Sequence, residues 1–594
     1  MSKKKIEVLC TAFRDGFQSV FGARVFMKDY IPAIEAARDA GITHFEFGGG
    51  ALFQSSFFYA NENAFDNMAK FREIVGPEAN LQTLSRGVNV VGLESQPRDI
   101  INLHAKLFKK YGTTTIRNFD ALNDVNNLEY SGKCIADNGL KHEISITMMD
   151  LPPGCEGAHD VSFYEKTLRQ ILDSGISYSS LCFKDASGTS NPRKVYETIK
   201  MARKLLDTKV PIVFHTHETA GVSVAAYLAA LDAGVNQIDL SLAPVSGGTC
   251  QPDILTMIHA LKGTEYDLGF DLNKILKAEE ILGECMKDYF VPPEALAVSP
   301  LIPFSPMPGG ALTANTQMLR DNGILDKYPE IIKAMSEVVR RGGYGTSVTP
   351  VSQFYFQQAF NNVMFGPWEK FADGYAKMIL GYFGKTPVEP DPELVKLAEE
   401  KMGLPKTAEK VVDLNEKDPN KGIMAAKKML TDASLPDTEE NIFITATCKE
   451  KGIAFLKGEG KVGVRKIEKI KKEKTDNFLV TVNDRKYPVI YKDGIATVDG
   501  KKYEVKVEAD LAGAPSKSIE HGADSMDIKS PLPGTILKVI KEAGKHVQKN
   551  DTLLILEAMK MVTEIKAPHD GLLLSIKVKA GDIVNNGQVL AQIS

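Results

Sequence analysis

The sequence predicts an α/β protein whose first domain is a (β/α)8 barrel, followed by a helical extension, a small β-rich domain and a C-terminal β-sandwich. Three observations predict this order. Eight short β-rich runs alternate with helical patterns between residues 6 and 265, a mainly helical stretch follows, and residues 527–594 contain two similar sets of short strands. A chain of 594 residues has room for about three or four such domains.

The predicted barrel strands are short, rich in β-forming residues and separated by helical patterns. The strands are expected at 6–13, 42–47, 80–84, 114–119, 143–149, 179–183, 210–215 and 237–242. Helices are expected between them, for example at 29–39, 124–138, 164–174 and 193–206. Eight alternating units in about 260 residues is the count of a TIM barrel, which we place at residues 1–270.

The composition is that of an ordinary globular protein, with 43% apolar and 25% charged residues. The net charge of −4 gives no reason to expect a nucleic-acid partner. No apolar run approaches the ~20 residues that span a bilayer, and the basic N-terminus lacks the apolar core of a signal peptide, so we expect a cytoplasmic protein. Seven scattered cysteines without CxxC spacing indicate reduced thiols.

Polar side chains follow the predicted strands, where a barrel of this kind places its active site. They are Arg14, Asp15, Gln18, Glu46, Arg86, Asp120, Asn123, Asp150, Lys184, Asp185, His215, His217, Ser246 and Thr249. Because the ends of parallel strands meet at one rim of the barrel, these residues are candidates for a common site.

His215 and His217 give the clearest metal signal among them. Alternate residues leaving a strand point the same way, so both imidazoles can bind one cation, with Asp15 as a carboxylate ligand. A pair of hydrogen-bonded barrel histidines is the alternative. A buried Lys184 beside a cation must pair with Asp185 or lose its charge, and carbamylation by CO₂ would turn it into an anionic oxygen ligand. A lysine paired with aspartates remains the plain alternative.

Lys560 stands between two methionines, on the predicted turn between the two C-terminal strand sets. Residues 531–536 and 568–573 flank it, and each leads into an alternating apolar run and a Gly-containing turn. The module resembles a biotinyl carrier domain, which implies biotin attached to Lys560. A lipoyl domain usually spells its lysine Asp-Lys-Ala, so the Met-Lys-Met setting favours biotin; an unmodified hairpin lysine is the other alternative.

The chain between barrel and carrier is expected to form three parts. Residues 271–430 are mainly helical in pattern and end in a helix expected near 407–430. Alternating runs at 478–484 and 503–507 predict a small β-rich interaction domain at 440–509, with strand-rich sequence from residue 442 onward. Residues 510–526, with Ala, Gly, Pro and Ser, are expected to be a linker to the carrier domain at 527–594.

Four motifs in the barrel carry a family resemblance. They are residues 14–19 (RDGFQS), 183–188 (FKDASG), 215–221 (HTHETAG) and 246–252 (SGGTCQP). In this order they resemble the motifs of the biotin-dependent carboxyltransferase family, which includes the carboxyltransferase subunit of two-subunit pyruvate carboxylases and the alpha subunit of oxaloacetate decarboxylase. The similarity covers about residues 6–475, including the segments 304–310 and 347–353, and resumes over the carrier.

The resemblance implies a role for individual residues. It implies that Arg86 binds the substrate carboxylate, that Gln18 contacts the keto acid, and that Thr249 carries a proton between pyruvate and biotin. An Arg86 salt bridge and a loop-capping Thr249 are the plain alternatives. A divalent metal, Zn²⁺, Mn²⁺ or Co²⁺, would be held by Asp15, carbamylated Lys184, His215 and His217.

Several positions depart from the family's pattern. Gly16 and Phe17 replace the usual Ala-His, Leu93 stands where a tyrosine is expected, and Gly48 replaces a tryptophan. All of them are expected near the pocket, which leaves the identity of the keto acid open.

The resemblance implies carboxyl transfer between carboxybiotin and pyruvate, giving or consuming oxaloacetate. The sequence contains no Gly-rich ATP-binding domain that would charge biotin. We therefore expect a separate biotin carboxylase subunit, as in a two-subunit pyruvate carboxylase; the alternative is a set of membrane decarboxylase subunits that export sodium, for which the linker is short. Carboxylation of 2-oxoglutarate and a non-catalytic scaffold that presents biotin are further alternatives. Biotin protein ligase and a second copy of the chain are also expected partners.

Overall fold

The computed structural model describes residues 3–467, 477–482, 485–492, 495–498, 501–504, 526–558 and 561–594. The chain forms two compact units, Met1–Lys466 and Ile467–Ser594, which are described separately. Among the described residues, no helix has the length and the apolar content needed to cross a bilayer.

The first unit is built on a closed barrel of parallel strands, in the order β2 to β9. The strands are β2 (Glu7–Cys10), β3 (His44–Gly49), β4 (Asn80–Ser85), β5 (Thr115–Phe119), β6 (Lys141–Thr147), β7 (Ser180–Asp185), β8 (Ile212–Thr216) and β9 (Gln237–Leu240). The barrel closes where β2 pairs with β9, with Glu7 opposite Gln237 and Cys10 opposite Leu240. All eight predicted strands are confirmed.

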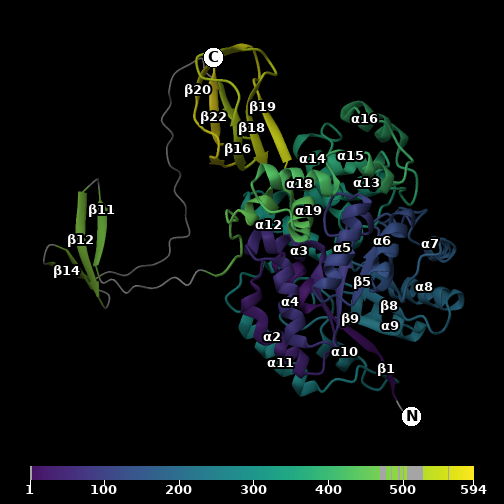
Figure 1. Ribbon diagram of the computed structural model, residues 1–594. Coiled ribbons are helices and arrows are strands. Elements are labelled where there is room, and N and C mark those ends of the chain that lie inside the picture. Colours follow the sequence, from purple (N-terminus) through teal and green to yellow (C-terminus); the bar gives the residue numbers. More distant parts are fainter. Residues whose placement is uncertain are drawn as a thin grey trace. The chain divides into compact units, whose positions relative to one another are not determined.

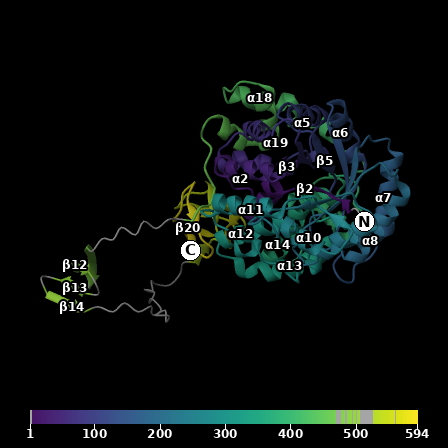
Figure 2. The ribbon, with the colours of Figure 1, turned by 90° about the horizontal axis from the view of Figure 1, so that it is seen from below.

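Helices surround the barrel, and Figures 1 and 2 show α5, α6, α7 and α8 at its periphery. The barrel helices are α1 (Phe17–Phe21), α2 (Met27–Asp39), α3 (Gly50–Ser55), α4 (Ala64–Val75), α5 (Arg98–Lys110), α6 (Asn126–Asp137), α7 (Val161–Asp173), α8 (Pro192–Leu205), α9 (Ser223–Ala233), α10 (Ile254–Ala260) and α11 (Leu272–Met286). Local sequence sets their starts: the Asp160 side chain accepts a hydrogen bond from Phe163 N to cap α7, and Asn191 caps α8 in the same way ahead of Pro192.

Large aromatic side chains fill the space between the first strands and their helices. Phe13 packs against Phe45 and Phe71, with ring centroids 6.1 and 5.6 Å away, and Phe17 lies 4.7 Å from Tyr30. All five side chains are buried. This packing fixes the segment after β2, which carries Arg14 and Asp15.

A helical extension follows the barrel. Its helices are α12 (Gly309–Asp321), α13 (Tyr328–Arg341), α14 (Val351–Phe365), α15 (Asp373–Ile379), α16 (Pro392–Met402), α17 (Val411–Glu416), α18 (Gly422–Asp432) and α19 (Glu439–Leu456). The single helix expected near 407–430 is therefore wrong, because two helices with a break between them occupy this stretch. Pro419 lies in the break, and Gly422 has a φ of +88° that a continuous helix does not allow.

The strand-rich sequence expected from residue 442 begins later. Residues 439–456 form α19, whose start is capped by the Thr438 side chain accepting from Asn441 N. The apolar residues that suggested strands pack against the barrel instead, and the Phe443 ring lies 5.4 Å from that of Phe53. Tertiary burial decides the conformation here, and the prediction was wrong for this segment.

The second unit contains an antiparallel sheet and a β-sandwich. The sheet consists of β11 (Asn477–Val482), β12 (Arg485–Lys492), β13 (Ile495–Val498) and β14 (Lys501–Glu504). The sandwich has two four-stranded sheets, ordered β15-β22-β20-β17 and β19-β18-β16-β21. Its strands are β15 (Met526–Lys529), β16 (Gly534–Val539), β17 (His546–Val547), β18 (Thr552–Ala558), β19 (Met561–Lys566), β20 (Gly571–Ile576), β21 (Ile583–Val584) and β22 (Val589–Ile593). The expected C-terminal β-sandwich is confirmed.

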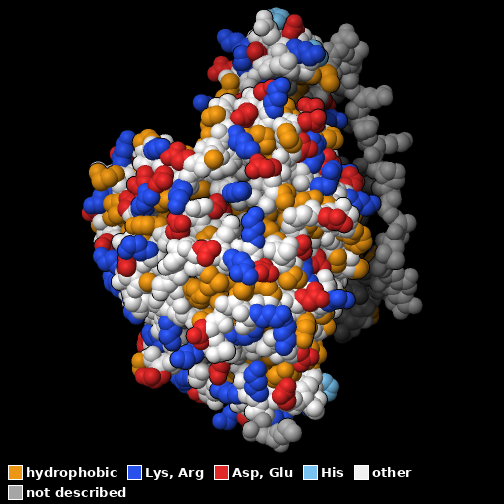
Figure 3. Space-filling model, turned by 90° about the vertical axis from the view of Figure 1, so that its right-hand side faces the viewer, with side chains coloured by type: hydrophobic (Ala, Val, Ile, Leu, Met, Phe, Trp, Pro, Cys, Tyr) orange, Lys and Arg blue, Asp and Glu red, His pale blue; other side chains and the backbone are white. Residues whose placement is uncertain are grey.

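The surface carries both signs of charge. Figure 3 shows lysine and arginine side chains intermixed with aspartate and glutamate on one face of the molecule. The acidic side chains on this face therefore do not form one continuous acidic region.

Candidate active site

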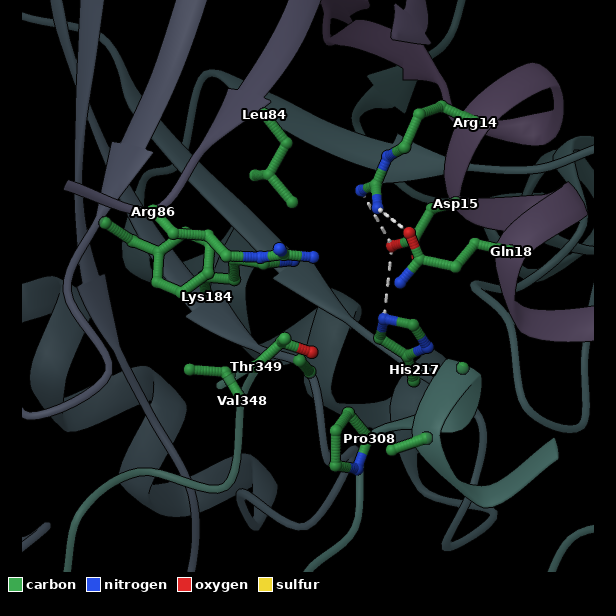
Figure 4. A pocket seen from close by; sticks show the side chains of 14 residues that line it. Arg14, Asp15, Gln18, Leu84, Arg86, Lys184, His217, Pro308, Val348 and Thr349 are labelled. Carbon is green, nitrogen blue, oxygen red and sulfur yellow. Dashed lines mark hydrogen bonds and ion pairs between the residues drawn. The ribbon is translucent and has the colours of Figure 1, made fainter. Parts of the chain in front are cut away.

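One pocket collects residues from the carboxyl ends of the barrel strands and from the helical extension. Its lining consists of Arg14, Asp15, Gln18, Leu84, Arg86, Phe119, Lys184, Ala186, His217, Pro308, Gly310, Ala311, Val348 and Thr349. In Figure 4, Arg86 and Lys184 reach into the pocket from one side, and Asp15 and His217 from the other. Residues far apart in the chain thus meet at one rim of the barrel.

Asp15, His215 and His217 form a cluster that could hold a metal ion. Asp15 Oδ2 lies 3.4 Å from His215 Nε2 and 3.2 Å from His217 Nε2, and all three side chains are buried. Burial alone would raise the pKa of Asp15, but the positive charge of Arg14 and the contact with His217 hold that pKa well below its ordinary value. The carboxylate is therefore ionised and ready to bind a cation.

The two imidazoles are oriented by partners behind them. His215 Nδ1 lies 2.8 Å from Asp239 Oδ2, and His217 Nδ1 lies 2.7 Å from the Thr249 carbonyl oxygen. Because Nδ1 donates to these acceptors, each Nε2 presents its lone pair to the cluster. Arg117 in turn forms a buried ion pair with Asp239. This mixed nitrogen and oxygen donor set fits Zn²⁺, Mn²⁺ or Co²⁺.

Lys184 extends from β7 towards the same cluster. Its Nζ lies 2.7 Å from His215 Nε2, and burial lowers the pKa of the amine. Asp185 is not its partner, because that carboxylate accepts hydrogen bonds from the backbone N–H groups of Ser187, Gly188 and Ser190. Of the two outcomes expected for Lys184, pairing with Asp185 is not observed; loss of the charge stays a prediction, and the lowered pKa is in its direction.

Two buried arginines border the pocket and differ in their partners. Arg14 lies 2.6 Å from Glu46 and 3.3 Å from Asp15, and its Nη1 donates to Gln18 Oε1 at 3.3 Å. Arg86 donates through Nη1 to the carbonyl oxygens of Val91 and Gly92, at 2.5 and 3.0 Å. Its Nε has no hydrogen-bond partner, and no carboxylate of the described residues forms an ion pair with it. The expected alternative of an Arg86 salt bridge is not observed.

Two threonines near the site also differ. The Thr249 hydroxyl is buried and lies 2.8 and 3.0 Å from the carbonyl oxygens of Ser19 and Ala295, to either of which its one hydrogen can be donated. Thr249 is not among the described residues that line the pocket, whereas Thr349 is, and Figure 4 shows its side chain there. The sequence prediction named Thr249 and missed Thr349, although Thr349 belongs to the quoted segment 347–353.

The positions that depart from the family's pattern do not line the pocket. Phe17 is buried in the aromatic core, and a Cβ added at Gly48 would meet Met68 and Thr83 at 3.5 Å. Leu93 is 37% exposed. The expectation that these departures reshape the keto-acid site is therefore not supported by their positions.

Other polar residues at the strand ends serve the fold. Asp120 Oδ2 accepts from Leu122 N, and Asn123 Nδ2 donates to the Thr147 carbonyl. Asp150 forms an ion pair with Lys194, and Ser246 Oγ donates to Asp253 at 2.9 Å. A polar residue at the end of a barrel strand is therefore not always part of the site.

Sequence reasoning also missed Gln251, which lies in the quoted motif 246–252. Its Nε2 lies 3.0 Å from Asp15 Oδ2 and 2.9 Å from His217 Nε2, inside the ligand cluster. The signal that could have found it is its place two residues after Thr249, in the loop between the last barrel strand and α10.

The candidate biotin site is in the second unit. Lys560 itself lies outside the described residues, but β18 and β19 form an antiparallel hairpin around it, with Ala558 opposite Met561. The turn predicted at Lys560 therefore stays a prediction, outside the described residues.

Comparisons with known proteins cover both units. The chain matches three family models, described as "Conserved carboxylase domain" (residues 302–510), "HMGL-like" (143–282) and "Biotin-requiring enzyme" (526–593). It is 30% identical over 562 residues to a pyruvate carboxylase subunit of Methanocaldococcus jannaschii, and the match covers 94% of each chain. It is 28% identical over 615 residues to the 2-oxoglutarate carboxylase large subunit of Hydrogenobacter thermophilus, covering 95% of this chain and 91% of the relative.

The fold also resembles a solved structure, the carboxyl transferase domain of Rhizobium etli pyruvate carboxylase. The match has a TM-score of 0.69 and 22% identity, and it covers 85% of this chain and 89% of that one. At this identity the likeness supports the fold.

Proposed function

Because the chain belongs to the biotin-dependent carboxyltransferase family, we propose that this enzyme transfers a carboxyl group between its biotin and pyruvate, as the carboxyltransferase subunit of a two-subunit pyruvate carboxylase. The observation that carries the proposal is one pocket that holds both a metal-ligand cluster and an arginine without a carboxylate partner among the described residues. A keto acid offers a carboxylate for the arginine and a carbonyl oxygen for the metal.

The substrate carboxylate would bind to Arg86. Its guanidinium is held by two backbone carbonyl oxygens, so its remaining donors can form charge-assisted hydrogen bonds to a carboxylate. Gln18 would contact the keto acid through its amide nitrogen, because its Oε1 accepts from Arg14. Both side chains are positioned before substrate arrives, which lowers the entropy cost of binding.

The metal would be held by Asp15, His215, His217 and a carbamylated Lys184. When bound, the metal supplies Lewis-acid chemistry and biotin supplies the carboxyl group. Carbamylation needs a neutral amine, and the lowered pKa of Lys184 supports this. The amine nitrogen forms a bond to the CO₂ carbon and loses a proton, which leaves an anionic carbamate within reach of the cluster.

We assign the proton transfer between the pyruvate methyl and biotin to Thr349 in place of Thr249. A proton carrier must lie within hydrogen-bond reach of the reacting atoms. Thr349 lines the pocket, while the one hydrogen of the Thr249 hydroxyl faces two backbone carbonyl oxygens. Thr249 would then be a positioning residue, because its backbone carbonyl oxygen accepts a hydrogen bond from His217 Nδ1.

We propose a separate biotin carboxylase subunit as the partner that charges biotin on Lys560, after biotin protein ligase has attached it. The relative from Methanocaldococcus jannaschii is itself one subunit of a pyruvate carboxylase, and it spans nearly the same length as this chain. We also propose a homo-oligomer in the cytoplasm. Membrane decarboxylase partners are the second candidate for the same chemistry run in the direction of oxaloacetate breakdown.

Carboxylation of 2-oxoglutarate is the alternative substrate proposal, supported by the Hydrogenobacter thermophilus relative. The departures at Gly48 and Leu93 would have favoured a wider site, but neither residue lines the pocket. Pyruvate is therefore the preferred substrate.

The experiment is to incubate the purified, biotinylated, metal-loaded chain with oxaloacetate and to measure pyruvate release. We expect release that depends on biotin, is lost in Lys560→Ala and is lost after chelation. Release of CO₂ from the carboxylated form of 2-oxoglutarate with no activity on oxaloacetate would contradict the substrate. Full activity in Lys560→Ala would contradict the role of biotin, and biotinylation without any transfer would favour the scaffold.

A further inference from the structure

The geometry points to Gln251 as the residue that positions the Asp15 carboxylate for the metal ion, an inference that rests on the ligand set proposed above. The Gln251 side chain is buried, and its Nε2 lies 3.0 Å from Asp15 Oδ2, 2.9 Å from His217 Nε2 and 3.4 Å from His215 Nε2. The amide nitrogen thus faces the point where the three ligand atoms converge.

The orientation of the Gln251 amide is set from the opposite end. The Thr11 hydroxyl donates to Gln251 Oε1 at 2.6 Å, and the Cys250 thiol lies 3.2 Å from the same oxygen. An oxygen that accepts from Thr11 leaves the NH₂ group to face the ligands. Thr11 directly follows β2 and Gln251 follows β9, so this hydrogen bond spans the pair of strands that closes the barrel.

The NH₂ group has two hydrogens and can donate to both Asp15 Oδ2 and His217 Nε2. An imidazole nitrogen has one lone pair, which a cation would take. A carboxylate oxygen keeps a lone pair for a donor while it binds a cation, so the bond from Gln251 to Asp15 is compatible with a bound metal.

The other neighbours of Asp15 lie slightly farther away, among them His217 Nε2, at 3.2 Å from Oδ2. Arg14 Nη2 lies 3.3 Å from Oδ2, and Ser19 Oγ lies 3.4 Å from Oδ1. The bond from Gln251, at 3.0 Å, is the shortest of these contacts. Without it, the carboxylate would be free to turn towards Arg14, away from the two imidazoles.

The experiment compares metal binding by the full biotinylated chain and by Gln251→Met, which has a similar length but no donor. The probe is Co²⁺, whose affinity is measured by competition with a chelator and whose visible absorption reports the ligand geometry. We expect Gln251→Met to bind Co²⁺ about 10 to 100 times more weakly, as is typical when a residue that orients a metal ligand is lost. We also expect its visible spectrum to change. Thr11→Val, which releases the amide from its oxygen side, should shift the spectrum in the same direction by less.

The matched control is Gln358→Met, because Gln358 is another buried glutamine whose amide groups are hydrogen-bonded, within the helical extension. It should lower the melting temperature without changing the affinity or the spectrum. Equal losses of metal in Gln251→Met and Gln358→Met, or an unchanged affinity and spectrum in Gln251→Met, would overturn the role of Gln251 alone. A wild-type chain that binds no Co²⁺, Mn²⁺ or Zn²⁺ would overturn the ligand set of the proposed function, and this inference with it.

Discussion

The two buried arginines of the pocket show two ways of using the same side chain. The charge of Arg14 is balanced within the protein by Glu46 and Asp15, whereas Arg86 has backbone carbonyl partners and no ion pair among the described residues. The two threonines differ in the same way, since the Thr249 hydroxyl is hydrogen-bonded to backbone carbonyl oxygens and Thr349 lines the pocket. Side chains that have partners within the protein hold the site in shape, and we infer that side chains with free donors facing the pocket bind the substrate.

The largest expected effect separates the two threonines. Thr349→Ala should lower the rate of carboxyl transfer by about 10² to 10⁴-fold, because general acid–base catalysis is worth that much, with the KM for pyruvate changed little. Thr249→Val should keep a rate within a few-fold of wild type and lower the melting temperature slightly, since it removes one buried hydrogen bond while the Ser19 and Ala295 carbonyl oxygens keep the Thr313 hydroxyl and the Thr249 backbone N–H as donors. The measurement is kcat and KM for both variants. The reverse pattern would return the proton transfer to Thr249.

The next effect separates the two arginines. Arg86→Met should raise the KM for pyruvate by about 10 to 100-fold, because the substrate carboxylate loses a charged hydrogen-bond donor. The free energy of unfolding should fall less than in Arg14→Met. Arg14→Met should lower the free energy of unfolding by about 3–5 kcal/mol, because it leaves Glu46 buried without its partner. Urea titration and steady-state kinetics on the same two variants measure both quantities. Equal stability losses in Arg86→Met and Arg14→Met would contradict the different roles of the two arginines.

A smaller effect concerns Lys184 and pH. Burial lowers the pKa of this amine below its ordinary value of 10.5, and the protonated form cannot react with CO₂. Metal occupancy should therefore fall several-fold when CO₂ and bicarbonate are removed, and it should fall as pH drops through the lowered pKa and recover as pH rises. Elemental analysis after dialysis with and without bicarbonate tests this. Occupancy independent of CO₂ at every pH would contradict carbamylation.

Much of the fold and part of the site could be predicted from sequence. The alternation of strands and helices located the barrel, and the rule that barrel chemistry lies at strand ends brought Asp15, Arg86, Lys184 and His217 together. The rule could not say which polar groups would be used by the backbone, which is why Asp120 and Asp150 were also candidates. That choice depends on side-chain direction and on loops that pack over the rim.

The misses have the same origin. Thr349 lines the pocket from the helical extension, and a rule about the ends of barrel strands does not predict such a residue. Gln251 was missed because only the threonine of its motif was considered. The strands expected after residue 442 became α19 because Phe443 packs against Phe53 and Phe108 of the barrel unit. Long-range packing decided the cases of Thr349 and Phe443, and a single sequence does not display it.

In the proposed function, a keto acid binds next to the metal and against Arg86 in one pocket. The most direct test is the NMR relaxation of ¹³C-labelled pyruvate in the presence of the Mn²⁺-loaded chain. We expect strong relaxation of the carboxyl and carbonyl carbons, retained in Arg14→Lys and largely lost in Arg86→Met while Mn²⁺ stays bound. Stoichiometric Mn²⁺ binding without any relaxation of pyruvate carbons would contradict it.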